Sequence, residues 1–379
     1  MKDSRGFLRL RPWAHPDNGR RGGVIFLLAG AIILLLPGSY GMTGHVLDFG
    51  AAWLAAWWFW AGLALGAQGT LWMQRLTGGG WIDPIAQPLN HLRAGTPAVG
   101  LLVLPLLVCL PELYPWARLD WVDPAKDTSF RELWFQPLGF ALRTMIYVLL
   151  WTLLARLDGA GGRAARRQGY AAVGLTLYAV TISLAAVDLL MSLTPVWYST
   201  AFGLVVLVAQ LKQALAAATY AAARRASADT RGDLGNLLLM YALTWAYIAF
   251  TQFQIIWAEN LPAEISWYLP RLSGPWAYIG LALVVSGLAL PLLVLLSRGF
   301  KRNARCLRGL AMLLLVVATT EVIWWVFPSV PGVDWQAAWM TVLAWSGMGL
   351  VLHGTARCFP TRLPPLPDAR KQEKEPRHA

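Results

Sequence analysis

A single charged residue, Asp188, interrupts a long apolar segment of the chain. An ionised carboxylate in the hydrocarbon of a membrane costs roughly 2.5–3.5 kcal/mol on insertion scales, so such a residue usually serves a function. Isolated polar residues interrupt three further apolar segments, at Arg143, at Gln252 and Gln254, and at Glu321. A cation, two carboxylates and side-chain amides can form ion pairs or transfer protons inside a membrane.

Two interpretations of these residues are open. In the first, Arg143 forms a structural ion pair with Asp188 or Glu321, because pairing lowers the cost of burying charge. In the second, Asp188, Glu321, Arg143 and Gln252 line either a quinone head-group site or the exit of a proton path. Glu321 is then the better proton carrier, since desolvation favours the neutral form of a carboxylic acid.

Gln254, Lys212 and His353 are secondary candidates. We expect the Lys212 side chain to extend toward the nearer, cytoplasmic membrane surface, as long basic side chains often do. His353 is the one histidine expected inside a membrane span, whereas a bis-histidine haem needs two that face each other. The cysteines form no metal-ligand pattern. The sequence therefore predicts no metal and no redox cofactor bound by this chain.

The elements that must position these residues are membrane helices. Of the 379 residues, 57% are hydrophobic and only 14% are charged, with a mean hydropathy of +0.48. Soluble domains have about 25% charged residues, so an all-α integral membrane protein is expected. Gly62 and Gly66 form a GxxxG pattern that predicts close helix packing. Windows of about 20 apolar residues, the length of one span, lie near 24–40, 51–73, 97–115, 137–155, 170–190, 200–222, 235–257, 275–297, 309–327 and 336–356.

The distribution of basic residues orients these ten spans. Of the 32 Lys and Arg residues, 26 lie in the two tails and alternate loops, and only four lie in the opposite loops. Because basic loops stay in the cytoplasm, both termini are predicted to be cytoplasmic. Asp188, Arg143, Glu321 and Gln252 then all lie in the outer third of the membrane.

The same distribution divides the chain into three parts. Residues 1–22 form a basic cytoplasmic N-terminus, residues 23–357 a polytopic membrane domain, and residues 358–379 a Pro-rich, charged tail that is predicted to be disordered. Since the positive charge is dispersed over several loops and two tails, the sequence predicts no binding of nucleic acid.

Two stretches resemble a known membrane-protein family. They are AAVDLLMSLTPVWYSTAFG, residues 185–203, and DLGNLLLMYALTWAYIAFTQFQIIWAENLPAEISWYLPR, residues 233–271. Both are similar to ActF-type subunits, the second NrfD-like (polysulfide-reductase-like) membrane subunits of alternative complex III, a bacterial quinol:cytochrome c oxidoreductase. The chain looks like a divergent member, with Gly287 at a usual His and Glu321 at a usual Asp. The matching residues include Asp188, Met191, Ser192, Pro195, Trp197, Ser199, Thr200, Asp233, Trp245, Tyr247, Gln252, Trp257, Asn260, Pro262 and Glu264.

The resemblance implies ten spans in NrfD-like helix bundles and a subunit that carries no redox cofactor of its own. Expected partners are an NrfD-like sister subunit, iron–sulfur and haem c subunits, and a terminal oxidase. Quinone or quinol would bind at the level of the complex, in the bacterial cytoplasmic (inner) membrane. The chain would then supply a proton path, a quinone-facing surface or both, and would not be an enzyme alone.

Two functions of other classes are the alternatives. A secondary transporter usually shows repeated halves with interrupted helices around a midplane site, and no repeat is visible here. A structural or assembly subunit attached to a terminal oxidase would need none of the buried polar residues for chemistry.

Overall fold

The computed structural model describes residues 16–120, 129–158 and 164–361, and every regular element among them is helical. Nine helical segments in these ranges are long and apolar enough to cross a membrane, which confirms the predicted all-α membrane fold. These segments are formed by α1 (Pro16–Gly41), α2 (Val46–Thr77), α3 (Ala86–Ala94) with α4 (Thr96–Leu102) and α5 (Leu104–Val108), α8 (Pro137–Leu157), α9 (Ala164–Leu189), α10 (Phe202–Ala222), α11 (Ala228–Glu259), α13 (Gly274–Val284) with α14 (Leu290–Leu295), and α16 (Ala304–Val326).

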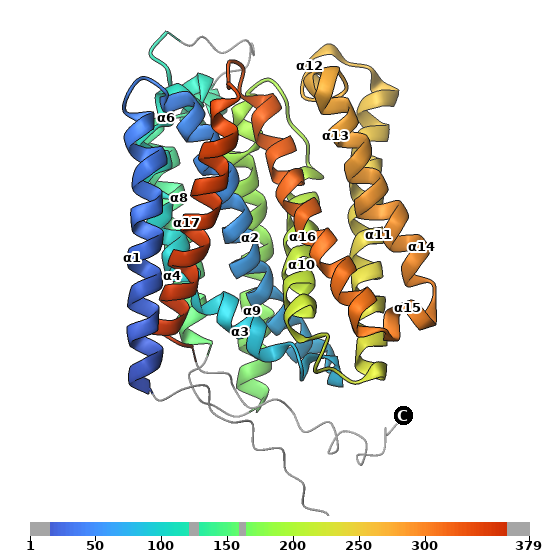
Figure 1. Cartoon of the computed structure of the whole chain (residues 1–379). Coiled ribbons are helices and arrows are strands. Elements are labelled where there is room, and N and C mark those ends of the chain that lie inside the picture. The colour runs from blue at the N-terminus through green and yellow to red at the C-terminus, as the bar shows by residue number, and fades with distance from the viewer. Residues whose placement is uncertain (1–15, 121–128, 159–163, 362–379) are drawn as a thin grey trace, which may run out of the picture.

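The tenth predicted span corresponds to α17 (Gln336–Cys358), which is not among these nine. It packs along α1 and α2 and runs the height of the bundle (Figure 1). The described chain therefore begins and ends at the same end of the bundle, as an even number of crossings requires. Residues 16–22 of the predicted N-terminal segment are already helical in α1. Residues 1–15 and 362–379, which hold most of the two predicted tails, lie outside the described ranges.

The third crossing differs from its predicted limits of 97–115. It begins with α3 at Ala86, which lies obliquely across the lower end of the bundle in Figure 1, and continues through α4, α5 and α6 (Leu110–Leu113). Pro97, Pro105 and Pro111 lie in the first turns of α4, α5 and α6. Proline lacks the N–H that a helix interior needs, so each of these residues starts a new helix.

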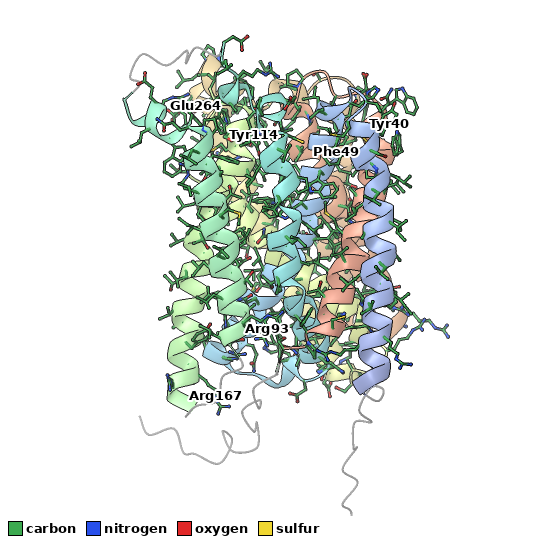
Figure 2. The ribbon with its side chains drawn as sticks, turned by 90° about the vertical axis from the view of Figure 1, so that its left-hand side faces the viewer. Tyr40, Phe49, Arg93, Tyr114, Arg167 and Glu264 are labelled. Atoms are coloured by element: carbon green, nitrogen blue, oxygen red, sulfur yellow. The ribbon has the colours of Figure 1, made fainter. Side chains whose placement is uncertain are left out.

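The two ends of the bundle differ in charge. Figure 2 shows Arg93 and Arg167 at one end and Glu264 at the other. We call the end with the arginines the inner end and the end with Glu264 the outer end, in line with the charge asymmetry of the loops. The remaining short helices are α7 (Ser129–Trp134) and α12 (Pro262–Ile265) at the outer end and α15 (Arg298–Arg302) at the inner end.

The centre of the bundle is built on α2 and α10. In the most apolar window of each helix, 89% and 83% of the residues are buried. The GxxxG glycines of α2 lie where the two helices touch: a Cβ atom on Gly66 would overlap the backbone carbonyl of Gln210, and one on Gly62 would overlap the Gln213 side chain. The pattern therefore serves close packing, and it brings the polar residues of α10 into the core.

Gly66→Ala is expected to destabilise the bundle, because the Gln210 backbone cannot move aside as a flexible side chain would. Overpacking of this kind typically costs about 1–3 kcal/mol. Heating the detergent-solubilised protein and measuring the fraction that stays monodisperse gives the comparison. Gly232→Ala is the control, since nothing lies within 4 Å of a Cβ atom there. Equal heat resistance of the two variants would contradict the role of Gly66.

Candidate functional site

The first buried ion pair lies near the outer end and joins α8 to α9. Arg143 donates through Nε and Nη2 to the two carboxylate oxygens of Asp188, at 3.0 Å each. The Tyr147 hydroxyl donates to Asp188 Oδ2 at 2.8 Å. Arg143 Nη2 also donates to the carbonyl of Trp134, and the guanidinium lies over the Trp134 ring. We call Arg143 and Asp188 the outer ion pair.

In the outer ion pair, both carboxylate oxygens of Asp188 have hydrogen-bond donors. Both Asp188 oxygens accept charge-assisted hydrogen bonds, which are the strongest kind available to a carboxylate. Asp188 is 1% exposed. This arrangement matches the structural interpretation of Arg143, in which the pair fastens α8 to α9.

Glu321 does not join this group, which corrects the expectation that residues of similar depth would meet. Its partner is Lys212: Nζ lies 3.7 Å from Glu321 Oε2, between α10 and α16. Both residues are buried, at 0% and 2% exposure. Residues at the same depth can still face different neighbours. The side chain of Glu321 points toward α10 rather than toward α8 and α9. We call Lys212 and Glu321 the central ion pair.

The position of Lys212 also differs from the expected one. The helix α10 runs from the outer end inward, and side chains on a helix tilt toward its N-terminus. Lys212 therefore extends outward to Glu321 instead of toward the cytoplasmic surface. Its ammonium also lies 3.9 Å from the centre of the Trp245 ring, a favourable contact for a cation.

The central ion pair is incompletely satisfied. Among the described residues, neither Lys212 Nζ nor Glu321 Oε1 has a hydrogen-bond partner. Unsatisfied buried polar atoms are costly, and at functional sites they are the groups that exchange protons or bind a ligand. The two ion pairs are thus chemically different. Both carboxylate oxygens of the outer pair accept hydrogen bonds, whereas the central pair keeps an unused donor on Lys212 and an unused acceptor on Glu321.

A polar group containing Gln252 lies outward of the central pair. Gln252 and Trp245 are seven residues apart on α11, so they share a helix face and are about 10 Å apart along the axis. Ser199 Oγ donates to Gln252 Oε1 at 2.9 Å, and Gln252 Nε2 donates to the Tyr268 hydroxyl at 3.0 Å. Burial raises the pKa of Tyr268, so its hydroxyl keeps a proton to donate. Gln254, by contrast, is exposed on another face of α11.

Further buried amides lie beside the central pair, between α2, α9 and α10. The Tyr178 hydroxyl donates to Gln210 Oε1 at 2.9 Å. Gln68 Oε1 and Gln210 Nε2 have no partner among the described residues. Gln213 donates to the carbonyl of Phe59. Polar side chains therefore lie both outward of the central pair, around Gln252, and beside it in the core.

The inner end holds a charge cluster whose two arginines were predicted to lie in a loop. Asp158 forms ion pairs with both Arg75 and Arg93 and accepts a hydrogen bond from Trp72 Nε1 at 3.1 Å. All four are at or near the buried core, and Arg93 is 0% exposed. The signal for this cluster was weak, because arginines at the ends of spans are the normal mark of a cytoplasmic loop.

His353 has a histidine partner, which corrects the expectation that none would face it. His91 lies in α3, and its Nε2 is 2.8 Å from His353 Nδ1. Two metal–nitrogen bonds of about 2 Å each place the nitrogens about 3.3 Å apart in a tetrahedral site and about 4 Å apart on opposite sides of a metal, farther than the distance here. The two rings are therefore joined by a hydrogen bond as they stand. The error arose because His91 was placed in a loop before a span that begins earlier than predicted.

Several of the residues that match the ActF-type pattern pack against other side chains or mark the ends of helices. Trp197 stacks on Trp267 with ring centroids 4.6 Å apart. Asn260 adopts a left-handed conformation, with φ at 51°, and ends α11, after which Pro262 begins α12. Of the others, Asp188 belongs to the outer ion pair, Trp245 contacts Lys212, and Ser199 and Gln252 are hydrogen-bonded to each other. The exposed motif residues are Thr200, Asp233, Tyr247, Trp257, Asn260 and Pro262.

No family model matches this chain, and no curated protein matches its sequence. The resemblance to ActF-type subunits is therefore a prediction from the residues named above. The fold and the two ion pairs are independent of it.

Proposed function

We propose that this chain is an integral membrane subunit of a respiratory quinol:electron-acceptor oxidoreductase similar to alternative complex III, in which it provides a proton path. The observation that supports this best is the central ion pair, a buried lysine and glutamate with unsatisfied polar atoms. The resemblance of residues 185–203 and 233–271 to ActF-type subunits supplies the class of complex.

In this proposal Glu321 and Lys212 exchange the proton. Transfer from the Lys212 ammonium to the Glu321 carboxylate turns two charges into two neutral groups, which the apolar core favours. The reverse transfer restores the pair. Gln252, Ser199 and Tyr268 lie on the outer side of this step, and Tyr178 and Gln210 lie beside it. Partner subunits with iron–sulfur clusters and haem c would carry the electrons.

The proposed location is the bacterial cytoplasmic membrane, with both termini in the cytoplasm. The loop charges and the placement of Arg93 and Arg167 at the inner end support this orientation. A quinone-facing surface on the same subunit is compatible with it.

Co-purification tests the class of complex. A tagged copy extracted from its native membrane in mild detergent is expected to bring haem c absorbance and iron–sulfur resonance signals with it. A colourless protein that moves a solute in liposomes would identify a transporter instead. Recovery with the haems of a terminal oxidase alone would identify an assembly subunit.

Glu321→Gln is expected to slow proton-coupled quinol oxidation at least about tenfold, since a positioned proton-transfer group typically contributes more than that. Turnover and proton release are measured on the purified complex in liposomes. Glu259→Gln is the matched control, because it removes an exposed carboxylate at the outer end of α11. Normal turnover and normal proton release in a fully assembled Glu321→Gln complex would remove Glu321 from the path.

A further inference from the structure

A long apolar groove opens between α16 and α17, which face the viewer in Figure 1 with α2 behind them. Its volume is about 1300 Å³. Side chains of the groove such as Met312, Val316 and Val342 are half to two-thirds exposed, so the groove is open on the side where lipid would lie. The central ion pair is not part of its lining.

Charges of opposite sign lie at the outer end of the groove and just beyond its inner end. Asp334 and Trp335 line the outer end, and Tyr220 lines the inner end. The guanidinium of Arg308 lies 4.3 Å from the centre of the Tyr220 ring. Among the described residues Arg308 forms no ion pair, and its buried Nε has no hydrogen-bond partner. The partly buried guanidinium of Arg308, with unused hydrogen-bond donors, therefore lies one helical turn inward of Met312, which lines the groove.

We infer that the inner half of this groove binds one anionic phospholipid, with its phosphate on Arg308 and an acyl chain along α16. From Arg308 to Thr319 the helix rises about 16 Å, which is close to half of a hydrocarbon core about 30 Å thick. A chain that starts at the cytoplasmic surface therefore ends near the middle of the groove. Basic pockets between membrane helices on the cytoplasmic side have the chemistry to bind anionic head groups.

The charge distribution favours this lipid over the other occupants of an apolar groove. An anionic head group is repelled by Asp334 at the outer end and attracted by Arg308 at the inner end. A quinone tail has no anionic group to pair with the guanidinium, and the phosphate of a zwitterionic lipid is offset by the ammonium group of its own head group. The inference concerns a bound structural lipid and does not depend on the proposed proton path.

Native mass spectrometry tests it. The purified full-length protein, with any subunits that accompany it, is incubated with equal amounts of phosphatidylglycerol and phosphatidylcholine that have identical chains. The expected result is a preference for phosphatidylglycerol of about fivefold, the usual effect of one basic side chain near a membrane surface. Arg308→Gln is expected to abolish the preference, while Arg305→Gln, an exposed arginine in the first turn of the same helix, is expected to keep it.

A second pair of variants tests the groove itself. Val316→Trp fills the groove and is expected to release the retained lipid, whereas Leu293→Trp adds the same ring on an exposed face of α14 and is expected to leave it bound. Elution as a single symmetric peak checks that both variants fold. Equal retention of the two lipids by the unchanged protein, an undiminished preference in Arg308→Gln, or recovery of quinone in place of phospholipid would overturn the inference.

Discussion

Arg143→Met will destabilise the protein by roughly 3–5 kcal/mol, because it leaves a buried carboxylate without its cation. Asp188 is 1% exposed and receives two of its hydrogen bonds from Arg143. The loss is measured as a lower yield of assembled protein and a lower midpoint of heat-induced aggregation in detergent.

The double variant Arg143→Met/Asp188→Asn distinguishes a structural pair from a functional one. Asparagine is neutral and still accepts the hydrogen bond from Tyr147, so most of the lost stability is expected to return. Since both oxygens of Asp188 are already hydrogen-bonded in the outer ion pair, we assign it no proton transfer and expect quinol-linked turnover to return as well. A stable double variant without turnover would place Asp188 in the proton path.

The positions of most membrane helices were predictable because they depend on local properties of the sequence. Apolar length sets where a helix crosses, and loop charge sets its direction. Nine spans and the additional helix α17 follow the predicted windows within a few residues at most ends. The main exception is the third crossing, where Pro97, Pro105 and Pro111 divide the helix and the first piece starts at Ala86.

Pairing of the buried residues was only partly predictable, because a sequence gives the depth of a residue but not the direction in which its helix faces. Arg143 and Asp188 were predicted as possible partners and do meet. Glu321 has a similar depth but faces α10. Its partner, Lys212, begins deeper in the membrane and reaches it because a long side chain tilts toward the helix N-terminus.

Prediction from the sequence had a second limit at the inner end, where it could not tell a buried arginine from an exposed one. Arg75 and Arg93 were counted as loop charges, yet they form one buried cluster with Asp158. The pattern that reports topology cannot separate an arginine in water from one folded back under the bundle. His91 was missed for the same reason, since it lies in a helix that the hydropathy window did not include.

The central ion pair should respond differently from the outer one when both of its charges are removed. Lys212→Met alone leaves Glu321 buried and unpaired, and the expected destabilisation is again roughly 3–5 kcal/mol. Lys212→Met/Glu321→Met replaces the pair by two apolar side chains of similar length. Such replacements of buried ion pairs are often neutral or stabilising, so heat resistance should recover.

Proton-coupled turnover should not recover in this double variant, because both ionisable groups of the proposed proton transfer are then absent. The expected loss is about a hundredfold, the lower end of what a proton-transfer group contributes. Heat resistance and proton release are measured on the same preparation, with Arg143→Met/Asp188→Asn beside it as the control for charge removal. If both double variants recover stability and turnover, the two pairs are equally structural, and a proton path through Lys212 and Glu321 is wrong.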